Sequence, residues 1–189
     1  FIDNILENEN KPTIISDEIP KNENLPYSIL SSMKTNYNEF DKIIESNRNE
    51  GKDCFIIFIN EDHKNFIKIL LTIKKVDDML KDQKVKFLFF DVSKNDLPEI
   101  IFNSQRNNEN IELPFMVRFS AKEKISADNL LFYQSSFDFS EIMNWVSFHS
   151  STKFALPKFN ETLINDEIFK QIPKKNKTLN FPKTDQFSS

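Results

Sequence analysis

The sequence contains one glycine and one cysteine among its 189 residues. The single glycine, Gly51, excludes the glycine-rich loops of nucleotide-binding proteins, because those turns need several residues without a Cβ to let the backbone approach phosphate. It also excludes the Gly-x-Ser-x-Gly turn of the common hydrolases. The single cysteine, Cys54, excludes a disulfide or a dithiol pair within the chain. The usual ATP- and NAD-dependent enzymes are therefore ruled out.

Histidine, basic charge and long apolar runs are also scarce. His63 and His149 are the only histidines, and no zinc-type spacing joins them to Cys54, so we predict no metal and no cofactor. The net charge is −4 and the lysines are scattered, which argues against a nucleic-acid partner. The longest apolar run, 54–59, falls far short of the roughly 20 residues that a membrane helix needs. We expect no membrane span.

Phenylalanine is abundant, with 20 residues, and it supports a folded core in a chain that is 39% hydrophobic. The length suits one domain with tails. We expect an extended N-terminal arm over residues 1–26, an α/β domain over 27–150 and an extended C-terminal tail over 151–189. In the tail, Phe154, Phe159 and Phe169 are candidate anchors on a groove of the domain or of a partner.

The first residue is Phe1 rather than Met, so we expect a processed or truncated product, and a missing leader then indicates nothing about location. Two glycosylation sequons begin at Asn160 and Asn176, but about three are expected by chance in a chain with this much Asn, Ser and Thr, so they favour the secretory pathway or the endoplasmic reticulum lumen over the cytoplasm only slightly. The localisation otherwise stays open.

The middle of the chain predicts alternating strands and helices. Residues 54–59 are apolar on both faces, which is typical of a central parallel strand covered by helices on two sides. Apolar residues then recur at three- and four-residue steps and predict a helix over 65–83. A second buried strand over 84–92 completes a right-handed crossover. Upstream, we expect an edge strand over 27–33 and a helix over 40–47 capped by Asn38.

Downstream, the pattern predicts a short helix over 97–102, a polar loop over 103–110 and an antiparallel hairpin of strands 115–119 and 130–133. The final helix begins at Asp138, which forms a capping box with Glu141. The predicted fold is therefore α/β, with a mixed sheet of four to five strands flanked by helices.

This order of elements, with Pro114 at the mouth of the hairpin, resembles the thioredoxin superfamily, including its protein disulfide isomerase branch, over roughly residues 27–150. In that family a Trp-Cys-x-x-Cys-Lys turn follows the central strand, and the equivalent stretch here is the hexapeptide His-Lys-Asn-Phe-Ile-Lys at 63–68. Lys64 and Ile67 stand where the cysteines would be, and Phe58 stands where the family has a buried acid. Disulfide exchange requires a thiolate, so the resemblance implies a redox-inactive member.

The resemblance also implies a peptide-binding patch. The family's cis-proline faces the active-site turn, and Leu113-Pro114 fits that position. A surviving groove would be bordered by residues from the turn and the proline loop, namely His63, Lys64, Phe66, Leu113 and Pro114. The alternative is that these are loop residues that only pack against one another.

We therefore expect a redox-inactive scaffold or interaction module whose partners are other proteins, as a subunit of a larger complex. Two alternatives stay open. The helix at 141–146 and the extended exit at 154–159 resemble the lumenal thioredoxin-like domain of an oligosaccharyltransferase-type or disulfide isomerase-type assembly. An enzyme is the other alternative, either a single-thiol redox protein that uses Cys54 or a glutathione transferase.

Overall fold

The computed structural model describes residues 14–16, 32–106 and 112–172. Five strands form one sheet in the order β1-β3-β2-β4-β5. Their bounds are β1 Lys34–Thr35, β2 Asp53–Ile59, β3 Val85–Asp91, β4 Phe115–Phe119 and β5 Leu131–Tyr133. The helices are α2 Phe40–Asn49, α3 Phe66–Met79, α4 Glu99–Arg106, α5 Phe139–His149 and α6 Glu161–Gln171, and Ala127–Asn129 form a 3₁₀ turn.

Strand β2 is the centre of the sheet, and all seven of its residues are buried. It runs parallel to β3, with Ile57 opposite Phe89, and antiparallel to β4, with Phe58 opposite Phe115. A strand with neighbours on both sides and helices on both faces has no exposed side, which explains its unbroken apolar sequence. The mixed sheet with flanking helices confirms the predicted thioredoxin-like α/β fold.

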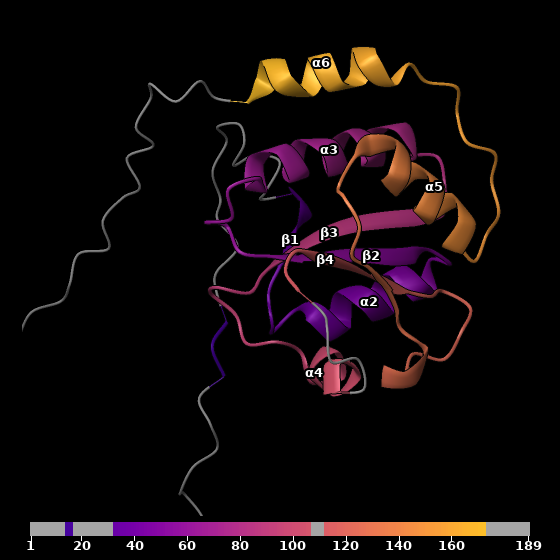
Figure 1. The fold of residues 1–189 in the computed structure, drawn as a ribbon. Helices are drawn as coiled ribbons and strands as arrows, with labels where there is room; N and C mark the ends of the chain where they lie inside the picture. Colours follow the sequence, from indigo (N-terminus) through magenta and orange to yellow (C-terminus); the bar gives the residue numbers. More distant parts are fainter. Residues whose placement is uncertain (1–13, 17–31, 107–111, 173–189) are drawn as a thin grey trace, which may run out of the picture.

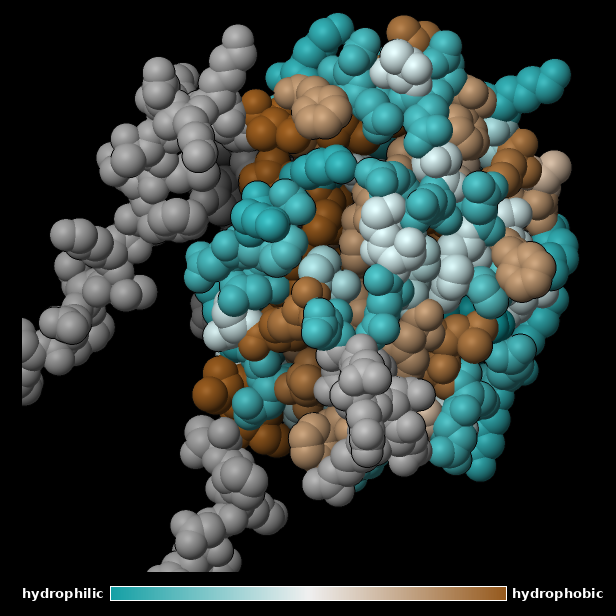
Figure 2. Space-filling view, in the orientation of Figure 1, coloured by the Kyte–Doolittle hydropathy of each residue, from teal (hydrophilic) through white to brown (hydrophobic). Residues whose placement is uncertain are grey.

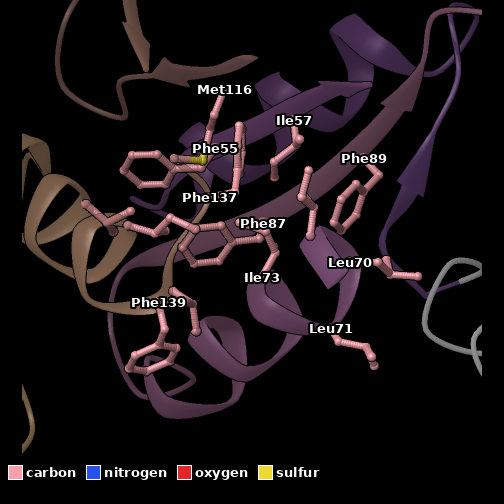
Figure 3. Packing of buried hydrophobic residues seen from close by; sticks show 14 of the residues in the cluster. Phe55, Ile57, Leu70, Leu71, Ile73, Phe87, Phe89, Met116, Phe137 and Phe139 are labelled. Atoms are coloured by element: carbon pink, nitrogen blue, oxygen red, sulfur yellow. The ribbon is translucent and has the colours of Figure 1, made fainter. Parts of the chain in front are cut away.

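The helices form two layers over the sheet. Helices α3 and α5 cover one face, with α6 outside them, and α2 and α4 cover the other (Figure 1). Because side chains alternate along a strand, Phe55 and Ile57 enter the core under α3 and α5, whereas Ile56 and Phe58 enter the core under α2. Figure 3 shows the first core, where the stacked rings of Phe55 and Phe87 have centroids 5.4 Å apart.

The N-terminal predictions need correction where the structure describes the chain. The predicted strand 27–33 lies mostly outside the described residues, and its last two residues are helical. The observed edge strand is β1, two residues long. Asn38 does not cap α2, because the N-cap position belongs to Glu39, whose backbone N–H donates to Asn36 Oδ1 at 3.0 Å. Helix α3 ends at Met79, four residues before the predicted end.

Two later predictions also differ from the structure. Helix α4 begins at Glu99 and takes up residues 103–106 of the expected polar loop. Asp138 occupies the N-cap position of α5 but makes no capping bond, because its carboxylate pairs with Lys68 at 3.1 Å. Glu141 accepts hydrogen bonds from Ser135 and Ser136 instead. The predicted capping box is therefore wrong.

The predicted extended tail contains a helix. Residues 151–160 form neither helix nor strand, but α6 follows and buries Ile164 and Ile168 against the core that α3 and α5 cover. Asn160 caps this helix, accepting the Leu163 N–H at 3.3 Å. One helical turn separates the two isoleucines, so they share a face, and this pairing is the reason the segment is helical. Residues 173–189 lie outside the described part of the chain.

The candidate anchors of the tail differ in burial. Phe154 and Phe159 are partly buried against the same core, and the Phe159 ring meets Phe139 at a centroid distance of 5.0 Å. Phe169 is 60% exposed and anchors nothing within the described residues. Of the expected N-terminal arm, only 14–16 is described; there the backbone N–H of Ile15 donates to Asp96 and its carbonyl accepts from the Asp96 N–H.

In Figure 2, hydrophilic residues cover much of the visible face, and hydrophobic residues appear between them. Among the helices that the structure describes, none is both long and apolar enough to cross a lipid bilayer.

Candidate functional site

The carboxyl ends of β1, β2 and β3 lie at one edge of the sheet, together with the start of β4. We call this the carboxyl edge. Strand register sets it: Ile59 at the end of β2 lies opposite Asp91 at the end of β3, and Phe115 at the start of β4 lies opposite Phe58. Pro114 therefore enters the sheet at the edge where β2 leaves it for the turn 60–65. Ligands of open α/β sheets bind at this kind of edge.

The turn after β2 carries His63 and Lys64. The His63 backbone N–H donates to the Asn60 carbonyl at 2.9 Å, and its imidazole Nδ1 accepts the Asn65 N–H at 3.3 Å, which holds the ring in the turn. Lys64 is exposed. Phe66 begins α3, and its side chain is 8% exposed and belongs to the core. Of these three residues, only His63 and Lys64 offer surface to a ligand.

The proline loop lies at the same edge. The Leu113–Pro114 peptide bond is cis, as the family resemblance implied. Leu113 is 45% exposed and Pro114 is half-buried. Lys64 and Ile67 are the two residues predicted to replace the family's cysteines. Lys64 lies in the turn, and Ile67 is half-buried against the core in the first turn of α3.

Below this surface lies an ion cluster of Lys34, Glu61, Asp91 and Lys94. Glu61 binds Lys34 Nζ through one oxygen at 3.0 Å and Lys94 Nζ through the other at 2.5 Å. The Lys34 side chain is only 2% exposed, and that of Glu61 19%. A buried ammonium requires a paired anion, so this contact ties the end of β1 to the turn after β2.

Asp91 is the most buried carboxylate of the cluster, at 3% exposure. Its Oδ1 accepts from the Ser93 N–H at 3.0 Å, the Ser93 hydroxyl at 2.7 Å and the Glu61 N–H at 3.4 Å. Its Oδ2 is buried with no hydrogen bond and lies 3.7 Å from Lys94 Nζ. Asp91 thus fixes both loops of the edge. In the described part of the chain, no group of three or more acidic, histidine or cysteine side chains could hold a metal.

No sequence pattern predicts this cluster directly. Glu61 and Asp91 each stand at the end of a predicted strand, and that position was a usable signal. In the sequence, however, Glu61 looks like any carboxylate in a turn, where solvation is the default. For Lys34 the sequence offers no signal, because β1 is too short to show a pattern.

Cys54 lies far from the carboxyl edge. It is the second residue of β2, paired with Lys86 on β3 and Phe119 on β4, and its exposure is 0%. Desolvation raises the pKa of its thiol to about 12, although the nearby Lys86 charge acts in the opposite direction. At neutral pH the sulfur is therefore a protonated core atom.

Comparison with known proteins identifies no function for this chain. No model of a known protein family matches the chain, and no curated protein matches it. Solved structures do match, among them the crystal structure of chloroplastic thioredoxin z. That match has 18% identity and a TM-score of 0.44, and it covers 60% of this chain and 89% of the other. A likeness of this degree concerns the fold alone.

The carboxyl edge therefore combines an exposed apolar residue, a cis-proline loop and a polar turn. Ion pairs connect this turn to β1 and to the loop after β3. Beneath it lie stacked aromatic rings: Phe58 meets Phe115 at a centroid distance of 4.9 Å. This arrangement can present a fixed backbone edge and an apolar contact to a peptide. It holds no thiol, because the only cysteine is at the other end of β2.

Proposed function

We propose that this chain is a redox-inactive thioredoxin-like module that binds other proteins as part of a larger complex. The observation that carries the proposal is the position of its one cysteine. Cys54 is fully buried at the end of β2 opposite the carboxyl edge. Thiol–disulfide exchange needs an accessible thiolate at the edge and a second thiol to resolve the mixed disulfide.

The residues at the edge support the same proposal. Lys64 and Ile67 take the positions of the family's two cysteines, and Phe58, with 0% exposure, takes that of its buried acid. Neither an ammonium nor an alkyl side chain can attack a disulfide. In this proposal the edge keeps the binding role of the fold without its chemistry.

The proposed ligand at this edge is an extended peptide segment of a partner protein. Leu113 supplies an exposed apolar contact, Pro114 shapes the loop, and His63 and Lys64 supply polar contacts from the turn. The ion cluster ties the turn after β2 to the ends of β1 and β3, so little ordering free energy is lost in that turn when a peptide binds. Phe66 is omitted from the proposed contact because it lies in the core.

A peptide panel tests this proposal. The full chain is screened against immobilised extended peptides, and the peptides it retains are re-measured with Leu113→Glu. The matched control is Phe148→Glu, which places the same charge on a residue that is 73% exposed on α5. We expect loss of binding for the first variant only. Equal binding by both variants would exclude the carboxyl edge as the peptide site.

The enzyme alternative is tested with insulin reduction and glutathione conjugation on the purified chain and on Cys54→Ser. We expect no turnover by either protein. Turnover that disappears in Cys54→Ser would overturn the proposal.

A lumenal role, as in an oligosaccharyltransferase-type or disulfide isomerase-type assembly, is the second candidate, and the position of Asn160 favours it. Asn160 and Thr162 of the sequon are both exposed. The Asn160 side chain caps α6 through its oxygen, which leaves the amide nitrogen available for a glycan. A mass shift after deglycosylation of protein from its native source supports the lumenal role, and an unmodified Asn160 argues against it.

A further inference from the structure

Helices α2 and α4 cover the sheet face opposite α3, α5 and α6 (Figure 1). A groove lies between these two helices. It consists of two adjoining hollows that share Phe40, Asp41 and Ile100 as lining residues. Phe40 and Ile44 are 1% and 6% exposed and form its apolar floor, with Ile100 half-buried beside them. The groove is thus separate from the carboxyl edge proposed as the peptide site.

The charge along this groove is predominantly negative. Asp41 and Glu45 lie one helical turn apart on α2, and Glu99 begins α4 across the groove; all three are exposed. Among the described residues, none of the three carboxylates has an ion-pair partner. Three unpaired carboxylates around an apolar floor complement a cationic, partly apolar ligand.

Arg48 is the one basic residue among the described residues that line the groove. Its Nη2 donates to the Glu123 carbonyl at 3.2 Å, which holds the guanidinium at the end of the groove. Its Nε is buried and has no acceptor among the described residues.

We propose that the α2–α4 groove binds a basic peptide segment of a partner protein. One apolar side chain of the segment lies on Phe40, Ile44 and Ile100, and its lysine or arginine side chains pair with Asp41, Glu45 and Glu99. The proposal for this groove does not rest on the carboxyl edge, so a negative result at one site leaves the proposal for the other unaffected.

The test uses the full chain and a labelled synthetic peptide of about ten residues, with lysines around a central phenylalanine. Fluorescence anisotropy at low salt measures its affinity. We expect binding of this peptide, no binding of its counterpart with glutamate at each lysine, and loss of affinity as salt rises. Equal binding of the glutamate peptide would overturn the proposal.

Charge variants locate the site. The triple variant D41N/E45Q/E99Q is expected to bind about tenfold more weakly, because it removes the three ion pairs of the complex. The matched control D62N/D82N/D166N changes the net charge equally at exposed positions outside the groove, and we expect less than about twofold change. Equal loss in both triples indicates attraction to overall charge and refutes a groove site.

A second pair of variants probes the apolar floor. Ile100→Ala is expected to weaken binding about threefold, whereas Phe102→Ala, on the same helix but outside the groove lining, leaves the affinity unchanged. Circular dichroism of each variant confirms that it is folded. An unchanged affinity for Ile100→Ala in a folded protein would remove the floor from the proposal.

The chain's own segment 174–183 is also basic and contains four lysines, so it is the competing occupant. The variant K174Q/K175Q/K177Q/K183Q separates the two cases. An unchanged peptide affinity supports a groove that is open to a partner. An affinity that rises about tenfold identifies the chain's own segment as the occupant and overturns the partner proposal.

Discussion

The buried thiol gives the sharpest prediction, because its reactivity can be calculated. Burial raises the pKa of Cys54 from an ordinary 9.0 to about 12. The thiolate is the reactive form, so at any pH well below 9 its population falls about a thousandfold relative to an exposed cysteine. Strands β3 and β4 pair with β2 on both sides, so alkylating reagents also have no access to the sulfur. We expect native Cys54 to be alkylated at least about a thousandfold more slowly than glutathione.

The assay is alkylation by iodoacetamide followed by mass spectrometry, for the native chain and for the chain in denaturant. The control is Phe148→Cys in a Cys54→Ala background, where the new thiol stands on a side chain position that is 73% exposed. This thiol should react at the rate of a free cysteine. If native Cys54 reacts within about tenfold of its denatured rate, the argument that the chain lacks usable thiol chemistry fails.

The same thiol makes stability depend on alkaline pH. Its folded pKa lies above its unfolded pKa, so its contribution is complete below about pH 9 and is lost as the pH rises toward 12. Within that window the unfolding free energy should fall by up to about 1.4 kcal/mol per pH unit more than that of Cys54→Ala. Parallel pH slopes of the two proteins in urea melts would contradict the burial.

Three further predictions concern stability, measured by urea unfolding. Glu61→Gln should lower the free energy of unfolding by about 2 kcal/mol, because the buried Lys34 ammonium loses that carboxylate. An unchanged stability would show that the ion cluster does not support the carboxyl edge. Asp53→Ala should lower the free energy of unfolding by about 3 kcal/mol, because its buried carboxylate accepts three hydrogen bonds from residues 121 and 151. A loss of less than about 1 kcal/mol would contradict this role of the carboxylate. Ile168→Ala should lose about 2 kcal/mol and Leu163→Ala, at 60% exposure, less than about 0.5; equal losses would show that α6 is not packed as described.

The centre of the fold could be predicted because the burial of each element leaves a pattern within a short stretch of sequence. Residues of β2 are buried on both faces, so the strand appears in the sequence as an unbroken apolar run. Helix α3 buries one broad stripe, and its three- and four-residue spacing is visible without knowledge of its neighbours. Hydrophobic periodicity therefore identified β2, α3, β3 and their parallel crossover.

The missed features depend on contacts between distant parts of the chain. Strand β1 has two residues and exists only through its pairing with Phe89 and Phe90 of β3. The ion pair of Lys34 and Glu61 spans 27 residues. Helix α6 is stable only when Ile164 and Ile168 pack against the core under α3 and α5, because so short a helix has marginal stability in isolation. No local pattern carries this information.

The two proposed sites are linked by a row of aromatic side chains. Phe40, which lines the groove, meets Phe58 at a ring centroid distance of 6.3 Å, and Phe58 stacks on Phe115, the residue after Pro114. Close-packed interiors transmit a change of volume, so a substitution at Phe40 would disturb both sites. The three groove carboxylates carry charge at the surface and are not part of this aromatic row. They belong to Asp41, Glu45 and Glu99. Substitutions of these carboxylates therefore change the groove while the packing beneath the carboxyl edge stays intact.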